Sequence, residues 1–471
     1  MLPVDWYCLV YGGALMATWR LERELPVTAE YDVVVCGAGP AGFCAAVQAG
    51  RLGARTALVE ATAVPGGVIT GGGNPDIALF YANRQHIIAG IGWEFVNELS
   101  RDGWAQIPDF FADLRHSQLG VRVNWPMAAH YMDQYCARAG VDLYYHHPVA
   151  DAASRASDRT RAGADGIVVD GVVVATKSGL QLIRGTVFVD ATGDGDVAAL
   201  AGMDYELGER YTGELQPGTL RFYPTGFDVS EMDEEQVRES WAAARERGEL
   251  EPGDYWPEPR GNPAGMFRHL GNNFNHVHPV NGADSGSRSE AEIRGRESVA
   301  RVTRWARAHV KGAEHFESLA LGATVAIRES RRITGLQHVT EKDYFSARQW
   351  EDAVCYAFYP IDLHRGVRDG QEDQESLRIR YLELSDGKVP TVPFGALVPR
   401  RSVNLLVAGR CVSSDRMANS AIRVKSPCMA MGQAAGAAAT IALENEGRVR
   451  TVDVRKLRQL LVEHGAIVPG A

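Results

Sequence analysis

The sequence predicts an α/β fold in which a parallel sheet, an antiparallel meander and an inserted α+β segment occur in one chain of 471 residues. Two observations lead to this prediction. Residues 31–60 alternate between strand-like and helix-like patterns, as in a parallel βαβ unit. Residues 141–191 contain several short strand-like runs, as in antiparallel strands that return to the parallel sheet.

The chain is long enough for more than one domain. Between about residues 205 and 390, charged helical patterns alternate with aromatic-rich strand patterns, so we expect a separate domain at 205–390. The domain with the parallel sheet is then discontinuous and consists of 31–204 and 391–471. Residues 1–30 are expected to be an N-terminal extension. Met16 opens a more ordinary N-terminus than Met1, so the first fifteen residues are expected to have no structural role.

The first predicted elements form the βαβ unit. Residues 32–36 are a short, mostly β-branched run that suits a buried parallel strand. Residues 40–52 are rich in alanine and predict a helix that Gly53 ends. Residues 56–59 predict the second strand.

The turn between the first strand and the helix reads GAGPAG at residues 37–42. Gly37 permits the tight turn, Gly39 lets a pyrophosphate reach the backbone, and Gly42 lets the helix pack closely on the strand. The helix N-terminus then stabilises the phosphate charge. Glu60 ends the second strand 18 residues beyond Gly42, where an acid that accepts the ribose hydroxyls is expected. Together these features predict a Rossmann-like dinucleotide-binding domain.

A second glycine pattern, GDGDVA at residues 193–198, imitates the first only loosely. Asp194 and Asp196 would place carboxylates where a phosphate should lie, and no second strand that ends in an acid follows. We therefore predict no second nucleotide site and no dedicated NAD(P)H domain.

The remaining elements follow from shorter patterns. Further strands are expected at 142–145, 166–176, 180–184, 187–190 and 404–408, a loop at 409–422 and a helix at 427–443. Gly432 and Gly436 give that helix a flat face that another backbone can approach closely.

Two helices are expected in the inserted domain. Ser230 is predicted to cap a helix that runs to Arg247. Ser289 and Glu292 have the spacing of a capping box, which predicts a long helix from there to Lys311.

The composition narrows the class of partner. A net charge of −10 argues against nucleic acid, whose phosphates require a surplus of Lys and Arg. Seven scattered cysteines without a CxxC pair fit a reducing compartment. No run approaches the ~20 apolar residues of a membrane helix. We expect a cytoplasmic enzyme that acts on a small molecule, and the sequence leaves its oligomer state open.

Three motifs carry a family resemblance: GAGPAG with Glu60, VDATGDGD at 189–196 and LVAGRC at 406–411. They resemble FAD-dependent oxidoreductases with a glutathione-reductase-type FAD domain. RESRRI at 328–333 and YPIDLH at 359–364 are similar to a largely uncharacterised bacterial branch of that group, and the resemblance covers about residues 21–447. It implies a Rossmann-like FAD-binding domain and FAD as the cofactor.

The resemblance also implies which residues contact FAD. Arg410 stands where many relatives have Asp, which leaves its contact open. The helix that starts near Pro427 would aim its N-terminus at the flavin pyrimidine ring and stabilise negative charge there. The implied contacts are Gly37, Gly39, Pro40, Ala41, Gly42 and Glu60 around the first turn, Gly66 and Gly67 at the flavin side, Val149 at adenine, Thr192 and Gly193 near the adenosine half, Gly409 and Arg410 near the pyrophosphate and ribityl chain, and Gly432 in the last helix.

Four residues are candidates for the substrate side. His364 is a candidate general acid or base because its ordinary pKa lies near neutrality, and Asp362 is placed to orient it. Arg331 and Arg423 are candidates to bind a carboxylate or stabilise an anionic intermediate. The alternatives are a structural His–Asp pair and arginines that form ion pairs between domains.

Metal binding is not predicted. His276 and His278 would lie on one face of a strand, but no acidic residue or cysteine has ligand spacing to them, and two imidazoles are too few for a closed site. We expect a role in a substrate pocket or at the surface instead.

The leading function is that of a dehydrogenase or oxidase that passes a hydride from a small organic substrate to flavin N5 and delivers electrons to an unknown acceptor. A flavin monooxygenase that NAD(P)H reduces directly is one alternative. A non-redox flavoprotein with structural FAD is another.

Overall fold

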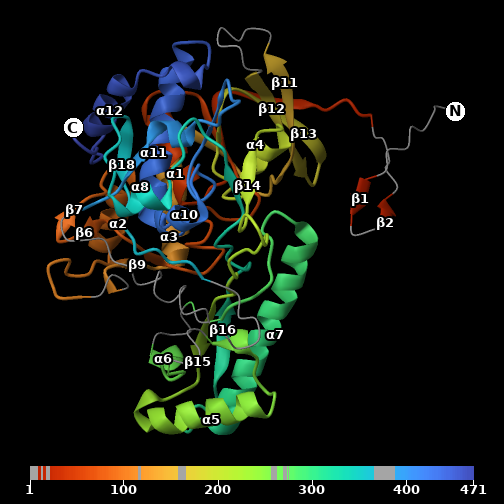
Figure 1. The fold of residues 1–471 in the computed structure, drawn as a ribbon, viewed down its shortest axis with the longest axis vertical. Coiled ribbons are helices and arrows are strands. Elements are labelled where there is room, and N and C mark those ends of the chain that lie inside the picture. Colours follow the sequence, from red (N-terminus) through yellow and green to blue (C-terminus); the bar gives the residue numbers. More distant parts are fainter. Residues whose placement is uncertain are drawn as a thin grey trace.

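The computed structural model describes residues 9–11, 14–16, 22–114, 118–157, 166–255, 262–268, 273, 275–364 and 388–471. Figure 1 shows a layered body around the largest sheet and, below it, a smaller body around the long helix α7 (Ser285–His309). The predicted α/β class is confirmed, because the largest sheet mixes parallel and antiparallel strands and helices cover it.

The largest sheet has seven strands in the order β10-β4-β3-β13-β12-β11, with β20 paired to β13. Pairing is parallel among β10, β4, β3, β13 and β20, and antiparallel from β13 through β12 to β11. The strands are β3 (Val27–Cys36), β4 (Thr56–Val59), β10 (Val141–Tyr144), β11 (Val149–Ser157), β12 (Gly166–Thr176), β13 (Gly179–Asp190) and β20 (Leu405–Val407).

The βαβ unit forms as predicted. β4 has the expected bounds, and helix α1 (Pro40–Arg51) follows the glycine turn. β3 begins at Val27, five residues before the expected strand, because its first half pairs with β13. The runs 180–184 and 187–190 form one strand rather than two, because Gly185 between them stays paired with β3.

Helix α11 (Lys425–Leu443) packs against α1 in the layered body. A Cβ atom added to Gly432 would lie 2.0 Å from the carbonyl oxygen of Ala41, and one added to Gly436 would lie 2.2 Å from that of Ala45. The flat glycine face therefore lets the two helices touch, as predicted. The expected loop 409–422 is only partly a loop, because helix α10 (Arg416–Ile422) forms where Asp415 accepts a capping hydrogen bond from the backbone N–H of Ala418.

The smaller body contains α7, α5 (Glu234–Glu246), α6 (Gly265–Arg268) and the antiparallel pair β15 (Phe222–Thr225) and β16 (Glu317–Leu321). Its own apolar cluster includes Trp241 and Trp305, whose rings meet edge to face. The predicted helix starts were wrong. α5 is capped by Asp233 and α7 by Asp284. Asp and Ser are about equally good N-cap residues, so the sequence did not distinguish these starts from the expected ones.

Residues 335–364 follow the smaller body in sequence but join the core of the layered body. Val339, Tyr344 and Ile361 belong to the hydrophobic cluster around α1 and α11. The elements of this region are α8 (Glu341–Phe345) and β18 (Ala353–Tyr356), and β18 pairs with β19 (Thr391–Pro393). The short strand β17 (Arg331–Ile333) precedes it. The division of the chain at residues 204 and 391 stays a prediction.

Shorter elements complete the fold. Helices α2 (Ile91–Arg101), α3 (Trp125–Arg138) and α12 (Val454–Glu463) lie in the layered body. The others are β1 (Leu9–Tyr11), β2 (Ala14–Met16), β5 (Asp76–Ile77), β6 (Tyr81–Ala82), β7 (Gln85–His86), β8 (Ala105–Gln106), β9 (Val121–Val123), α4 (Asp196–Leu200), β14 (Tyr205–Leu207) and the 3-10 turns Val229–Glu231, Pro252–Asp254, Phe394–Leu397 and Val449–Thr451.

Candidate active site

Four parallel strands end at one level of the largest sheet. Cys36, the last residue of β3, pairs with Val59 of β4 and with Asp190 of β13, and Asp190 pairs with Val407 of β20. The residues that follow these strands meet at the carboxyl edge, where open α/β sheets bind ligands. Most of the predicted cofactor residues are among them: Gly37, Gly39, Pro40, Ala41, Gly42, Glu60, Thr192, Gly193, Gly409 and Arg410.

The glycine turn leaves open space in front of α1. Gly37 has φ 93°, and a Cβ atom added to Gly42 would lie 1.7 Å from the carbonyl oxygen of Gly37, so the turn is closely packed on that side. A Cβ atom added to Gly39 would meet no atom within 4 Å. No side chain caps the N-terminus of α1. Its first backbone N–H groups therefore face open space, as anion binding requires.

Two further loops adjoin this turn. The backbone N–H of Gly66 donates to the carbonyl oxygen of Ala38 at 2.7 Å. A Cβ atom added to Gly67 would lie 3.1 Å from the Cα of Gly39, and one added to Gly409 would lie 3.1 Å from the Cβ of Ala41. The segments predicted to approach the flavin and the pyrophosphate thus lie beside the first turn of α1.

Glu60 lies at the same edge with its carboxylate directed at the turn. One oxygen accepts the backbone N–H of Ala38 at 2.7 Å, and the other accepts the N–H and hydroxyl of Thr62 at 2.9 Å. These bonds fix the carboxylate at the end of β4. The carboxylate of Glu60 could there accept hydrogen bonds from the hydroxyl groups of a ribose next to the pyrophosphate.

Three predicted contacts lie around this centre. Val149 begins β11. The hydroxyl of Thr192 donates to Asp190 at 2.7 Å, and burial raises the pKa of Asp190 to about 6. Gly432 lies against Ala41, so its observed role is the packing of α11 on α1. The bare helix end, the open space at Gly39 and the placed acid together fit a dinucleotide such as FAD.

Arg410 does not project freely toward this space. Its guanidinium donates to Asp194 at 2.8 Å and to the hydroxyl of Ser330 at 2.6 Å. Asp194 is 7% exposed and also accepts from Ser330 and Arg288. The carboxylate of Asp194, which argued against a phosphate site at the second glycine pattern, therefore forms ion pairs with Arg410 and Arg288.

The predicted His364–Asp362 pair is present. His364 Nε2 lies 3.0 Å from Asp362 Oδ2, and His364 Nδ1 lies 3.1 Å from His276 Nε2. His364 and His276 are both buried. Both ring nitrogens of His364 thus have a partner that can exchange a proton with it.

Arg423 joins the same cluster. Its Nη2 donates to Gln216 Oε1 and to the carbonyl oxygen of Asp362, both at 3.2 Å, and it lies 4.0 Å from Asp362 Oδ2. The amide oxygen of Gln216 also accepts the backbone N–H of His364 at 3.2 Å. Burial lowers the pKa of Arg423 below its ordinary value, and the charge of Asp362 opposes that shift. Gln216 thus links the arginine to the histidine.

Arg331 lies elsewhere. Its Nη1 donates to Asp196 at 2.8 Å, and its guanidinium lies 5.5 Å from the ring centroid of Tyr205. These contacts match the ion-pair alternative for Arg331. A role for this residue in catalysis stays a prediction, and its hydrogen bonds go to Asp194, Asp196 and Ala283 rather than to the cluster around His364.

The family model described as FAD dependent oxidoreductase matches residues 32–461. The chain belongs to this family. FAD is its cofactor, and it is an enzyme.

The curated relatives match only part of this chain in sequence. A dihydrolipoyl dehydrogenase of Trypanosoma brucei brucei is 41% identical over 66 residues, 14% of each chain. One of Mycobacterium tuberculosis is 28% identical over 158 residues, 33% of this chain and 32% of that one. The matches thus cover about a third or less of these relatives. A solved geranylgeranyl bacteriochlorophyll reductase-like protein of Thermoplasma acidophilum has a TM-score of 0.40 and 12% identity, covering 92% of this chain and 84% of that one.

Sequence reasoning missed several residues of this FAD-dependent oxidoreductase. Gln216 belongs to no quoted motif, and Glu329 lies within RESRRI but was given no role. Their links to the candidate site join segments more than 85 residues apart in sequence. His276 was expected to lie in a substrate pocket or at the surface, but it was not predicted as a partner of His364. Among the described residues, no group of three or more metal-ligating side chains occurs, and no helix is long and apolar enough to cross a membrane.

Lys425 is the first residue of α11, and its Nζ donates to the backbone oxygen of Asp76 at 2.6 Å. Burial lowers its pKa from 10.5 to about 7, and the charge of Asp76 opposes that shift. Between these two values the unfolded chain binds the extra proton, so Lys425 makes the stability of the FAD-free protein rise with pH.

We expect Lys425→Met to stabilise the FAD-free protein by about 1–3 kcal/mol near pH 6.5 and by much less near pH 9.5. Urea denaturation at the two pH values measures this difference. Lys456→Met, at an ion pair on the exposed surface of α12, is the control. An effect of Lys425→Met that is equal at both pH values would contradict the assignment.

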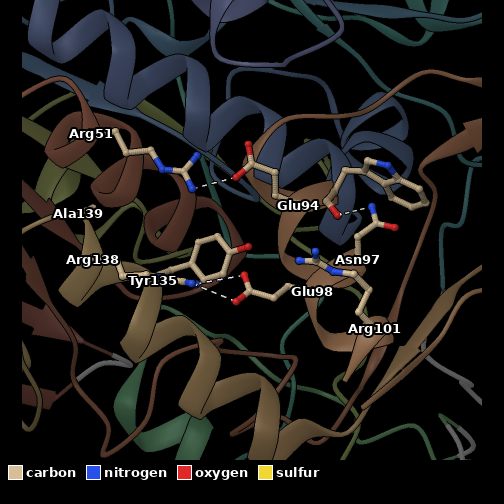
Figure 2. A pocket seen from close by; sticks show the side chains of 9 residues that line it. Arg51, Glu94, Asn97, Glu98, Arg101, Tyr135, Arg138 and Ala139 are labelled. Carbon is tan, nitrogen blue, oxygen red and sulfur yellow. Dashed lines mark hydrogen bonds and ion pairs between the residues drawn. The ribbon is translucent and has the colours of Figure 1, made fainter. Parts of the chain in front are cut away.

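The larger described cavity, about 510 Å³, lies away from this site (Figure 2). It is formed by α1, α2 and α3 and begins near Arg51, about 18 Å along α1 from the glycine turn. Arg51 pairs with Glu94, and Arg138 pairs with Glu98 and lies 4.4 Å from the ring centroid of Tyr135. Most of the charges that line this cavity are thus in ion pairs, and we give the cavity no catalytic role.

Proposed function

We propose that the protein is a dehydrogenase or oxidase that oxidises a small organic molecule at the cluster of His364, Asp362, His276, Gln216 and Arg423. The observation that carries this proposal is the chain of hydrogen bonds Asp362–His364–His276 beside a buried arginine. When bound, FAD supplies the acceptor for the hydride of the substrate. The remaining chemistry is the removal of a proton, which is what a carboxylate-supported imidazole provides.

The position of α11 supports this proposal. Arg423 lies two residues before α11, and the Sγ of Cys428 in the first turn of α11 lies 3.8 Å from the position of a Cβ atom on Gly409. The Sγ of Cys428 also donates to the backbone oxygen of Arg423 at 3.1 Å, so the backbone of Arg423 lies close to the loop that adjoins the dinucleotide turn. A substrate between them would meet the cofactor on one side and the imidazole pair on the other.

Each residue has a distinct part. Asp362 holds the Nε2–H of His364, which leaves Nδ1 directed at His276. A proton taken up by His276 can then pass to His364, whose positive charge Asp362 stabilises. Arg423 lies where it can stabilise negative charge on the substrate, since its Nε has no hydrogen-bond partner among the described residues.

The test is anaerobic mixing of the FAD-loaded protein with a panel of small alcohols, amines and hydroxy acids. We expect at least one compound to bleach the flavin absorbance without NADH or NADPH. If only NADPH or NADH bleaches it, the monooxygenase alternative is favoured. If the panel, NADH and NADPH all leave it unchanged, structural FAD is favoured.

With the compound that bleaches the flavin, His364→Asn is expected to slow bleaching by about 10²–10⁴-fold, because an amide cannot accept the proton that the substrate releases. Stopped-flow absorbance measures the rate. His130→Asn on the exposed surface of α3 is the matched control and is expected to keep the rate. Equal rates for wild type and His364→Asn would remove His364 from the chemistry.

We also propose that the protein is cytoplasmic and that it passes its electrons to an acceptor outside the chain. The location is supported by six described cysteines, all buried and none in a disulfide.

A further inference from the structure

A second cavity lies where the two bodies meet. It has a volume of about 170 Å³ and is lined from the layered body by Pro75, Arg122, Val123 and Trp125 and from the smaller body by Arg221 and Tyr223. In Figure 1, β9, which carries Arg122 and Val123, lies at the lower edge of the layered body, and β15, which carries Tyr223, lies in the smaller body below it. Ligand cavities in enzymes often lie at such junctions between domains.

Arg221 is the charged wall of this cavity and is 2% exposed. Its Nη1 donates to Asn74 Oδ1 at 3.0 Å and lies 3.6 Å from Asp76 Oδ2. Its Nε has no hydrogen-bond partner among the described residues. A buried guanidinium donor without an acceptor costs stability, so its retention indicates that a ligand supplies the acceptor.

The charges around Asp76 do not balance. Arg122 donates to both oxygens of Asp76, at 2.8 and 3.4 Å, while Arg221 lies farther from the same carboxylate. Lys425 donates to the backbone oxygen of Asp76 rather than to the carboxylate. One carboxylate therefore faces two guanidiniums. This surplus of positive charge favours an anionic ligand.

The other walls are apolar or aromatic. Trp125, Tyr223, Val123 and Pro75 offer rings and methyl groups, and the guanidinium of Arg221 lies 5.4 Å from the ring centroid of Tyr223. A cavity of about 150 Å³ holds benzene. A cavity of about 170 Å³ can therefore hold a molecule with one aromatic ring.

We propose that this cavity binds a small organic carboxylate, with its flat apolar body between Trp125 and Tyr223 and its carboxylate on Arg221. A planar guanidinium and a carboxylate form paired hydrogen bonds, which satisfies the buried donor. The cavity is close to the candidate active site, because five residues of chain, at most about 17 Å, separate Arg221 from Gln216. Binding here does not depend on the proposed role of His364.

The experiment is calorimetric titration of the FAD-loaded protein with benzoate, with butyrate as a smaller carboxylate, and with uncharged benzamide. We expect benzoate to bind and benzamide to bind at least about tenfold more weakly. Arg221→Met is expected to weaken benzoate by about 10- to 100-fold and to leave benzamide unchanged. Trp125→Ala is expected to weaken both.

The matched control is Arg138→Met, which removes the same charge at the other cavity (Figure 2) and is expected to leave benzoate binding unchanged. If Arg221→Met does not fold with FAD, Arg122→Met, whose side chain is 40% exposed, serves for the same comparison. No heat from either carboxylate up to about 10 mM would overturn the proposal. Equal affinity for benzoate and benzamide, or an equal loss in Arg138→Met, would overturn it as well.

Discussion

Gly39→Ala is expected to leave the FAD-free protein folded and to weaken FAD binding by about 100-fold or more, which corresponds to about 2.7 kcal/mol. The free protein tolerates the methyl group because a Cβ atom at Gly39 meets nothing within 4 Å. Its backbone, with φ −66° and ψ −175°, is also allowed for any residue. The pyrophosphate needs the same space, since it must approach the backbone in front of α1.

Two measurements separate these effects. Urea denaturation of the FAD-free protein should give a free energy of unfolding within about 1 kcal/mol of wild type. Titration with FAD, followed by quenching of flavin fluorescence, should show the loss of affinity. Wild-type affinity in Gly39→Ala would contradict the placement of the pyrophosphate at this turn.

Gly42→Ala is the matched comparison. Its added Cβ atom would lie 1.7 Å from the carbonyl oxygen of Gly37, so the turn itself must shift. We expect Gly42→Ala to destabilise the FAD-free protein as well as to lose FAD. The two glycines of one motif thus have different roles, one for the ligand and one for packing.

The sequence predicts the dinucleotide half because its signals are local. β3, the glycine turn, α1 and β4 follow one another within about 30 residues, and each has a pattern that its neighbours support. The flat face of α11 was also predicted, because Gly432 and Gly436 are four residues apart and therefore lie on one face of the helix. The first residues of helices were harder to predict. Ser289 and Asp284 can both cap the N-terminus of α7, and only the fold selects between them.

The substrate side was predicted only in part, because its contacts join distant segments. His364 and Asp362 were found from their spacing, but His276 lies 88 residues away and Gln216 lies 148 residues away. The hydrophobic periodicity of a sequence predicts local elements and does not show which distant side chains come into contact. Arg331 and Arg423 looked alike in sequence, and only the surrounding acids distinguish them: Asp196 pairs with Arg331, whereas Arg423 keeps a long contact with Asp362.

Glu329→Ala is expected to destabilise the protein by about 3–5 kcal/mol, the cost of leaving buried charges without a partner. Glu329 is 1% exposed. Its carboxylate accepts from Arg332 at 2.8 Å, from Arg416 at 2.9 Å and from the backbone N–H of Gln216 at 3.0 Å. Removing it leaves two guanidiniums in a site that water does not reach.

Urea denaturation measures the change, and Glu30→Ala is the control. The ion pair of Glu30 with Arg184 is more than half exposed on both sides, at 62% and 52%, and its loss should cost less than about 1 kcal/mol. A cost for Glu329→Ala as small as for Glu30→Ala would mean that Arg332 is held sufficiently by the carbonyl oxygens of Gly208 and Ser414.

The same substitution connects stability with the candidate active site. Glu329 fixes the backbone of Gln216, and the side chain of Gln216 in turn holds Arg423 and the backbone of His364. Glu329→Ala should therefore slow flavin bleaching by the substrate even at temperatures where the variant is fully folded. A folded variant with the wild-type bleaching rate would show that His364 and Arg423 are positioned without Gln216, through Asp362 and His276 alone.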